Sequence, residues 1–431
     1  MAGSSFAEVS LGEIADFRNG KAISPEKYTP AGKHPVFGSN GQIARSDEVL
    51  YPEPAIVIGR VGAYCGCVHY VPRASWVTDN AIVALPKDGN DIRYLFYLLG
   101  SLELQRTAIG SAQPLMTQGG LKVVRTKAPP LAEQKAIAAV LGALDDKIEL
   151  NRRMNATLEA IARAIFRSWF VDFDPVRANM DRRGSGRGQK SEIGRVKSEM
   201  VQPSDISDFT FQSSLFLDPA TAALFPDSFQ DSALGEIPKG WRVGTLGELV
   251  ELRMDRVDAT SAKDSARYIA LEDMPSKSID LSSFRLGSAV NSSITAFHKG
   301  DVLFGSMRPY FHKVGLAFFD GITRTTTFVL RPRKDCFRHF ALLHFFSDDV
   351  VAHSTTASVG TTIPYVKWDS MESYRIPIPP DSLLKAFEKT VSPLVQRIAA
   401  QGEESRTLAT LRDTLLPKLL SGELDIKEVA V

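Results

Sequence analysis

The sequence predicts an α/β protein built from two similar domains, each followed by a long helix. Two observations support this fold class. Short motifs of the first half recur in the same order in the second half, and in each half a Pro-Pro pair is followed by apolar residues at heptad spacing. The length of 431 residues also exceeds what one hydrophobic core usually holds, so at least two domains are expected.

The internal repeat is defined by matches that are weak singly and informative together. Residues 11–14, Leu-Gly-Glu-Ile, recur as Leu-Gly-Glu-Leu at 246–249, and Arg18 matches Arg253. Farther along, four loop residues recur at unchanged spacing, with Gly110, Pro114, Pro129 and Pro130 matching Gly360, Pro364, Pro379 and Pro380. The distance in sequence between equivalent residues is larger at these four matches than at Arg18 and Arg253, which implies a longer loop in the second copy. Two unrelated domains with chance similarity are the alternative.

The globular part of each copy is expected to be a sheet with short helices packed on it. Runs rich in β-branched residues and bounded by Gly, Pro or Asp predict strands at 54–59, 80–85 and 326–330. Residues 92–104 and 337–346 are apolar and contain no internal proline, which is typical of helices. Each domain is therefore predicted to be α/β.

After each Pro-Pro pair, the apolar pattern becomes that of a helix facing a partner helix. The heptad positions are Ile137, Leu144, Asn151, Leu158 and Ile165 in the first copy, and Phe387, Leu394, Gln401, Leu408 and Leu415 in the second. Asn151 and Gln401 share the same middle position. A polar core residue fixes the register of a coiled coil at some cost in stability, although a position that simply tolerates polarity would look the same.

A break is expected early in each of these helices. Ser392 and Pro393 look like an N-cap and a first helical residue, and Gly142 and Ala143 stand at the same place in the first copy. Each arm is therefore predicted to be a short helix leading into a longer one.

The formal net charge of +1 is an objection to a nucleic-acid partner, because domains that bind phosphates usually carry a basic excess. Positive charge must then be local or supplied by a partner. The clearest basic run consists of Arg177, Arg182, Arg183, Arg187, Lys190, Arg195 and Lys197. It precedes an acidic stretch that contains Asp205, Asp208, Asp218, Asp227 and Asp231.

Composition also bears on location and on metal binding. No stretch approaches the ~20 apolar residues of a membrane helix, and the N-terminus does not look like a secretory signal, so a cytoplasmic protein is expected. The cysteines are Cys65, Cys67 and Cys336, and no histidine pair stands at zinc spacing. We therefore expect no metal site.

The sequence contains no convincing catalytic motif, so a non-enzyme is expected. It lacks the Gly-rich cofactor loop and the Asn/Asp-Pro-Pro-aromatic motif of an adenine methyltransferase, and it lacks a phosphate-binding loop for ATP. Asp381, Asp425 and Lys427 can be arranged into a nuclease pattern. A helix cap at Asp381 and a short tail around Asp425 explain these residues better.

Four segments resemble the specificity subunits of type I restriction-modification systems. They are 131–138, Leu-Ala-Glu-Gln-Lys-Ala-Ile-Ala; 166–175, Phe-Arg-Ser-Trp-Phe-Val-Asp-Phe-Asp-Pro; 235–241, Gly-Glu-Ile-Pro-Lys-Gly-Trp; and 415–424, Leu-Leu-Pro-Lys-Leu-Leu-Ser-Gly-Glu-Leu. The resemblance covers nearly the whole chain, and these segments are more specific than the globular domains.

The resemblance implies two target-recognition domains separated by two long antiparallel coiled-coil helices. Each domain would read one half of an asymmetric, bipartite site in double-stranded DNA. Two methylation subunits and two restriction subunits, the latter acting as nuclease and translocase, would complete the complex. S-adenosylmethionine, ATP and magnesium would belong to these partners, and this chain would bind no cofactor. The near-neutral charge then fits, because the partners would share the phosphate contacts.

On this interpretation the chain divides into six segments. They are a first target-recognition domain at 1–130, a first helical spacer at 131–175, a linker or insertion, partly irregular, at 176–235, a second target-recognition domain at 236–380, a second helical spacer at 381–425 and a tail at 426–431. The linker is longer than a simple connection needs.

Contacts to bases need side chains that pair with base edges and stand on loops. The candidates in the first domain are Arg18, Lys21, Asn40, Gln42, Arg60, Gln113 and Gln118. Those in the second are Arg253, Arg256, Arg308, Lys313, Arg324, Thr361 and Lys367. Solvated surface residues would look the same. Arg60 differs from its counterpart Ser306, and Gln113 differs from Ile363, which predicts two different half-sites.

An aromatic cluster lies where the first long helix is expected to end. Trp169, Phe170 and Phe173 are candidates for a docking face for the methylation subunit, with packing against the adjoining domain as the alternative. The alternative for the whole chain is a scaffold that binds no DNA and joins partner subunits through its coiled coil.

Overall fold

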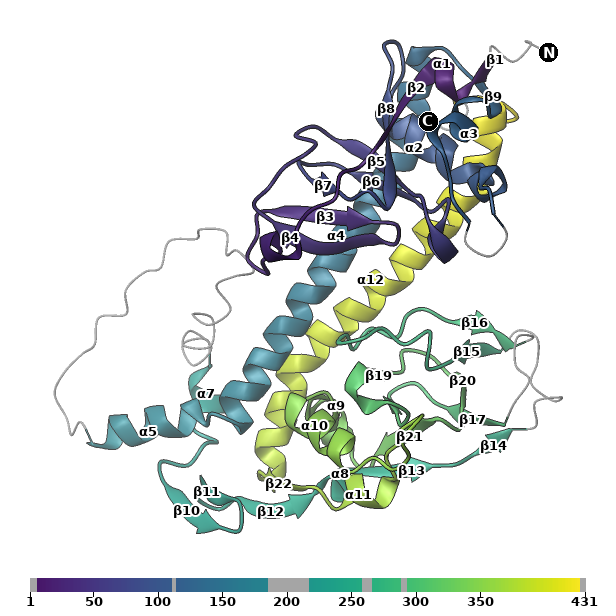
Figure 1. Ribbon diagram of the computed structural model, residues 1–431. Helices are drawn as coiled ribbons and strands as arrows, with labels where there is room; N and C mark the ends of the chain where they lie inside the picture. The colour runs from purple at the N-terminus through teal and green to yellow at the C-terminus, as the bar shows by residue number, and fades with distance from the viewer. Residues whose placement is uncertain (1–5, 111–113, 185–216, 258–265, 288–292, 427–431) are drawn as a thin grey trace. The chain divides into compact units, whose positions relative to one another are not determined.

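The computed structural model describes residues 6–110, 114–184, 217–257, 266–287 and 293–426. The chain divides into two compact units, one made of residues 1–148 with 407–431 and the other of residues 149–406. Each unit contains one globular α/β domain and a segment of each of two long helices (Figure 1). The predicted fold class is confirmed.

A four-stranded antiparallel sheet forms the centre of the first domain. Its strands, in spatial order, are β2 (Ala15–Asn19), β8 (Ala81–Pro86), β5 (Ala55–Gly59) and β6 (Val68–Val71). Both faces of β5 are buried. Ile56 and Ile58 pack into the core that contains helix α2 (Ile92–Ser101), while Ala55 and Val57 pack into a separate cluster on the other face. The unbroken apolar run of β5 is typical of a strand covered on both sides.

Shorter elements surround this sheet. They are the strands β4 (Gly41–Ser46), β3 (His34–Gly38) and β7 (Trp76–Val77) of a second sheet, the pair β1 (Ala7–Ser10) and β9 (Arg125–Ala128), the helices α1 (Leu11–Ile14) and α3 (Gln118–Lys122), and the 3-10 turns η1 (Pro25–Lys27), η2 (Gly62–Tyr64) and η3 (Leu104–Thr107). Helix α2 begins after Asp91, whose carboxylate accepts hydrogen bonds of 2.9 Å from the backbone N–H groups of Arg93 and Tyr94. This cap satisfies two N–H groups that the helix itself cannot pair.

The second domain repeats the four-stranded antiparallel sheet. Its strands are β13 (Val250–Arg253), β21 (Thr327–Pro332), β18 (Val302–Gly305) and β19 (Val314–Leu316). The helices and turns of this domain are α8 (Leu246–Leu249), α9 (Arg338–Phe345), α10 (Asp348–Thr356), α11 (Trp368–Glu372), η6 (Pro309–Phe311) and η7 (Asp335–Phe337). A two-stranded pair joins β12 (Arg242–Thr245) to β22 (Arg375–Ile378).

The two domains share connectivity beyond their central sheets. In the first, Val61 and Ile109 each form a bridge with Leu115. In the second, the equivalent residues Met307 and Val359 each form a bridge with Tyr365. The same backbone junction is thus built twice, which confirms the internal repeat.

The copies differ in their second sheet. The first domain has three strands there, whereas the second has five, namely β14 (Arg256–Val257), β17 (Ile294–Phe297), β20 (Gly321–Arg324), β15 (Arg267–Ile269) and β16 (Arg285–Leu286). Four of these strands, β14, β15, β16 and β17, lie in the part of the second copy in which the sequence predicts additional residues.

The two long helices are α4 (Leu131–Phe170) and α12 (Asp381–Ser421). Within the second unit, the Asn151 amide donates to the carbonyl of Gln401 (3.4 Å), and the Asn155 amide donates to the carbonyl of Ile398 (3.3 Å). The later residue of α4, Asn155, contacts the earlier residue of α12, Ile398, so the two helices run antiparallel. Within the first unit, Asp145 and Arg412 form an ion pair of 2.7 Å between the same helices.

The predicted breaks in the helices are wrong, because α4 and α12 are continuous for 40 and 41 residues. Pro393 lies inside α12, where the packing of the helix outweighs one lost backbone hydrogen bond. Gly142 has a different role. A Cβ there would lie 2.8 Å from the guanidinium of Arg93, which reaches across to donate to Asp146 (2.8 Å). The glycine makes room for this contact and does not end the helix.

The segment predicted as a linker is partly helical where the structure describes it. Its described elements include α5 (Asp174–Gly184), α7 (Pro219–Ala222) and the hairpin of β10 (Phe229–Ser232) and β11 (Gly235–Pro238). Arg183 and Asp227, from the basic run and the acidic stretch, form an ion pair of 2.9 Å. Most of the remaining charged residues of these stretches, and the tail from 427, lie outside the described residues.

Candidate nucleic-acid interface

Four of the DNA-contact candidates in the first domain are exposed. Arg18 is on β2, Lys21 follows this strand, Asn40 lies in the turn between β3 and β4, and Gln42 is on β4. Strand β7 connects the segment of Arg18 and Lys21 to the hairpin of Asn40 and Gln42. Its residue Val77 accepts a hydrogen bond from the backbone N–H of Lys21 and pairs with β3. The structure therefore brings two cations and two amides onto neighbouring segments.

Arg60 and Gln118 are half-buried and bind the protein's own backbone. The Arg60 guanidinium donates to the carbonyls of Met116 (3.3 Å) and Asp79 (3.4 Å). The Gln118 amide, turned so that both its atoms are satisfied, donates to the carbonyl of Phe17 at 3.1 Å. These contacts hold the loops in place, which leaves both side chains fewer free donors. Gln113 lies outside the described residues.

Two cations of the second domain are similarly engaged. The Arg253 guanidinium lies 3.2 Å from Glu251 and 3.1 Å from Asp255, so its charge is neutralised locally. Lys313 donates to the carbonyl of Leu271 at 2.7 Å. Both are weaker candidates for a phosphate or a base than the sequence alone indicates.

Arg256 and Arg324 are differently placed, at one end of the five-stranded sheet. In β17, Thr295 pairs with Arg256 and Ile294 pairs with Arg324. Arg324 is half-buried, and its Nε atom is buried without a hydrogen-bond partner among the described residues. Leaving such a donor unpaired is costly, but this atom is itself out of reach of solvent, so an external acceptor could meet only the exposed part of the half-buried side chain.

Arg308, Thr361 and Lys367 come together around one loop. The backbone N–H of Arg308 donates to the carbonyl of Pro364 at 2.7 Å, which ties η6 to the loop at 360–364. Arg308 has a left-handed backbone with φ of 49°, a conformation that its equivalent Gly62 also has. Thr361 and Lys367 are exposed on either side of this junction.

The aromatic cluster at the end of α4 belongs to the core of the second unit. Trp169 and Phe170 are each 2% exposed and pack on Phe387, while Phe173 packs on Trp241 with ring centroids 5.6 Å apart. Two side chains buried to this extent cannot present a docking face. The structure therefore supports the packing alternative.

The coiled-coil positions Asn151 and Gln401 are both buried and lie together. Besides Gln401, the Asn151 amide donates to Glu404 (2.9 Å) and Ser405 (3.2 Å). The Gln401 amide contacts the sulfur of Met154 at 3.3 Å. A different helix register would bury these amides against apolar neighbours, so the contacts support the predicted role in register.

A buried polar contact that the sequence did not reveal joins the second domain to α4. Glu159 accepts hydrogen bonds from the hydroxyl of Ser278 (2.6 Å) and the N–H of Ile279 (3.1 Å), and Asn155 donates to Asp280 (3.1 Å). Burial raises the pKa of both carboxyls, Glu159 and Asp280, above the ordinary range. Glu159, an acidic residue one turn after Asn155, could have been singled out in the sequence, but its partners Ser278 and Ile279 are too distant in sequence to be predicted.

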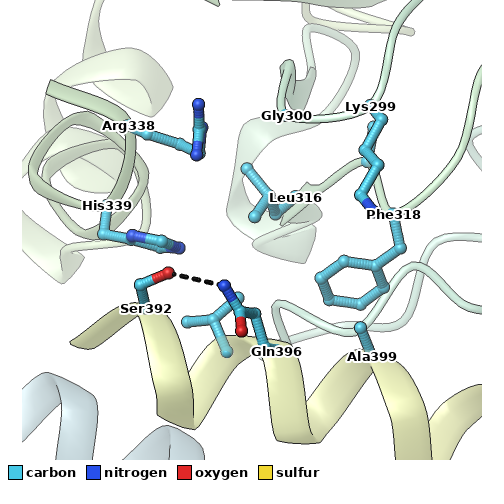
Figure 2. Close-up of a pocket in the computed structure, with 11 residues that line it drawn as sticks. Lys299, Gly300, Leu316, Phe318, Arg338, His339, Ser392, Gln396 and Ala399 are labelled. Atoms are coloured by element: carbon cyan, nitrogen blue, oxygen red, sulfur yellow. Dashed lines mark hydrogen bonds between the residues drawn. The ribbon is translucent and has the colours of Figure 1, made fainter. Parts of the chain in front are cut away.

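A pocket of about 520 Å³ lies between the second domain and α12 (Figure 2). Lys299, Arg338, His339, Ser392 and Gln396 are among its lining residues. The His339 ring contacts Glu388 at 2.7 Å, and the Ser392 hydroxyl accepts from Gln396 at 3.0 Å. His339 and Ser392 therefore have different partners, and the lining contains no serine that is hydrogen-bonded to a general base.

Comparison with known proteins decides the family. Residues 4–160 and 238–402 match the model of the type I restriction modification DNA specificity domain. The chain belongs to this family. The specificity subunit is 27% identical to the type I restriction enzyme MjaIX specificity subunit of Methanocaldococcus jannaschii, over 80% of this chain and 72% of the relative. It is 25% identical to the HindI specificity subunit of Haemophilus influenzae, over 81% and 79% of the two chains.

A solved structure shows the same fold. The type I restriction-modification S subunit from M. genitalium aligns over 97% of both chains with a TM-score of 0.56 and 16% identity. The family model and the curated relatives confirm the predicted resemblance, and the alternative of a scaffold that binds no DNA is not favoured. None of the described helices of the specificity subunit has the length and apolar character of a membrane span.

Proposed function

We propose that this specificity subunit reads an asymmetric, bipartite site in double-stranded DNA, one half with each domain. One observation carries the proposal. The two domains repeat the same sheet and the same backbone junction, yet the side chains at the junction differ, with Arg60 replaced by Ser306 and Gly62 by Arg308. A common scaffold with different donors suits two different half-sites.

The candidate donors indicate how the halves would differ. The first domain presents the exposed amides of Asn40 and Gln42, and amides pair well with adenine. The second has the exposed Arg256 and the half-buried Arg308 and Arg324, and guanidinium groups pair well with guanine. The first half-site is therefore expected to be richer in specified adenines, and the second in specified guanines.

The paired helices and the partner subunits complete the proposal. The helices would fix the gap between the half-sites, and the buried amides of Asn151 and Gln401 would fix their register. Two methylation subunits and two restriction subunits would assemble on this chain in the cytoplasm. Because they would supply S-adenosylmethionine, ATP and magnesium, this chain needs no catalytic group or cofactor of its own. They would also supply phosphate contacts, which fits a net charge of only +1.

Binding to duplex DNA with and without the methylation subunit tests this proposal. The complex is expected to bind one sequence at least ~1,000-fold more tightly than random duplex, with an affinity that falls as salt rises. The chain alone is expected to bind more weakly, because it lacks shared phosphate contacts. A complex that binds no duplex DNA would support the scaffold alternative, and one that binds all duplexes equally would contradict the reading of a specific site.

A further inference from the structure

A short segment of the second domain, residues 278–282, contacts both long helices. Its side chains alternate in direction, as they do in a strand, and Asp280 forms a parallel bridge with Leu316 of β19. Ile279 and Leu281 are buried and belong to hydrophobic clusters that contain residues of β18. The intervening residues, Ser278, Asp280 and Ser282, contact α4 or α12. We call residues 278–282 the anchoring segment.

Hydrogen bonds hold the anchoring segment on α4. The Glu159 carboxylate accepts from the Ser278 hydroxyl (2.6 Å) and from the backbone N–H of Ile279 (3.1 Å). The Asn155 amide donates to the Asp280 carboxylate (3.1 Å). Both helix residues are buried, so moving the segment would leave their polar groups without partners at a large cost. These contacts therefore favour a single position of the segment on α4.

Close packing holds the same segment on α12. Gly402 is buried, and a Cβ atom at this position would lie 2.5 Å from the Cβ and Oγ atoms of Ser282. Because packed atoms do not come so close, any larger residue at 402 would displace the segment. Just after the segment, the Arg406 guanidinium of α12 lies 4.6 Å from the centroid of the Phe284 ring, which is a cation–π contact.

The helix residues that hold the anchoring segment are not repeated in the sequence. At the offset of the four loop matches, each corresponds to a residue of different chemistry. The pairs are Asn155 with Ser405, Glu159 with Ala409, Gly402 with Arg152 and Arg406 with Ala156. The segment itself lies between Arg253 and β18, where the second copy is longer than the first. Domain and helices thus carry matching features that belong to the second copy alone.

We propose that the anchoring segment holds the second domain in one orientation on the paired helices and thereby sets how strictly the gap between the half-sites is enforced. This inference rests on the proposed function, which supplies the two half-sites. A domain that tilted on its helices would reach half-sites at several distances. Buried hydrogen bonds on α4 and close packing on α12 oppose such tilting. Asn155, Glu159 and Gly402 are then positioning residues that act through the orientation of the domain.

The variant Gly402→Ala tests this inference in the full chain, co-expressed with the methylation subunit of its own system. Alanine favours a helix more than glycine does, so α12 itself is not weakened, whereas the new Cβ displaces Ser282. Mapping of modified adenines is expected to show one gap length for the unaltered chain. The variant should keep both half-sites but also accept gaps one base pair longer or shorter. Its preference for the original gap should fall at least ~10-fold, the factor that one buried hydrogen bond accounts for.

Hydrogen exchange measures the anchoring segment directly. The backbone N–H of Ile279 is protected by Glu159 in the unaltered chain, so it should exchange faster in Gly402→Ala. Combining Gly402→Ala with Ser282→Gly removes the two atoms that the new Cβ meets, and it should restore slow exchange and the single gap length. Gly100→Ala is the matched control in α2. A Cβ added there meets nothing within 4 Å, so neither readout should change.

The outcomes separate this inference from the proposed function. If the unaltered chain uses one gap length and Gly402→Ala keeps it, the inference is wrong and the proposed function stands. A wider range of gaps without faster exchange at Ile279, or one that Ser282→Gly does not reverse, would also overturn the inference. If the unaltered chain modifies no specific sequence, the proposed function fails and the inference fails with it.

Discussion

At the scale of single residues, local partners separate the cations that can reach DNA from those that cannot. Arg253 faces two carboxylates. Among the described residues, no carboxylate forms an ion pair with Arg256, and no acceptor forms a hydrogen bond with the buried Nε of Arg324. The neighbours of Arg253, Glu251 and Asp255, were visible in the sequence and could have lowered its rank. The strand pairing places Arg256 and Arg324 two strands apart at one end of the sheet, on opposite faces of it, and it joins distant segments, so no local pattern could have shown it.

Alanine substitutions should therefore affect DNA binding unequally. Arg324→Ala and Arg256→Ala are each expected to weaken binding of the target sequence by about 1–3 kcal/mol, the usual value of a good base contact. Arg253→Ala is the matched control and should cost less, because its charge is already paired. Fluorescence anisotropy with the assembled methylation complex measures all three. Equal losses for the three variants would contradict this ranking.

The buried carboxyl of Glu159 makes stability depend on pH. Burial raises its folded-state pKa above the ordinary 4.5, so the folded protein holds this proton more tightly than the unfolded chain does. Its contribution to stability is fully present below about pH 4.5 and is lost as pH rises through the folded-state pKa. Glu159→Gln keeps an acceptor for Ser278 and Ile279 but cannot ionise.

The variant Glu159→Gln should consequently gain stability relative to the unaltered chain as pH rises. Urea unfolding of both proteins between about pH 4.5 and 7.5 measures this difference, and the other titrating groups largely cancel in it. Glu159→Ala, which removes the acceptor, should be destabilised by about 1–3 kcal/mol. A stability difference between Glu159→Gln and the unaltered chain that does not change with pH would contradict the account.

At the scale of elements, local patterns of apolar residues predict the strands and helices correctly, whereas the breaks predicted inside the long helices are wrong. The strands around 54–59 and 80–85 follow from local runs of β-branched residues, and the two long helices follow from apolar residues at heptad spacing; the structure confirms both. Pro393 and Gly142 were misread because local rules for helix ends ignore what packs against the helix. The contact of Glu159 with the segment at 278–280 was missed for the same reason: it depends on residues far apart in the chain.

The end of α4 gives an element-scale prediction. Trp169→Ala should destabilise the second unit by about 3–5 kcal/mol, because it removes a buried ring that packs on Phe225, Phe387 and Phe170. Trp169→Phe keeps most of the apolar volume and should cost less. Thermal unfolding of the full chain measures both effects. If Trp169→Ala unfolds like the unaltered chain but loses the methylation subunit, the docking alternative returns.

At the scale of the whole molecule, duplication explains both the fold and the proposed function. The central sheets and the bridges to Leu115 and Tyr365 are common to both copies, whereas the second sheets and the candidate DNA contacts differ. An asymmetric DNA site would use the parts that differ. The near-neutral charge, an objection in the sequence, is consistent with phosphate contacts made largely by partners.

The most direct test of the central claim is to map modified adenines across the DNA of cells that express this chain with its methylation subunit. The account predicts one bipartite sequence, with two different specified halves separated by a gap of constant length. Exchanging the second domain for that of another specificity subunit should change one half and leave the other intact. A palindromic target with identical halves, or modification without any sequence preference, would contradict the claim that two unlike domains read the site.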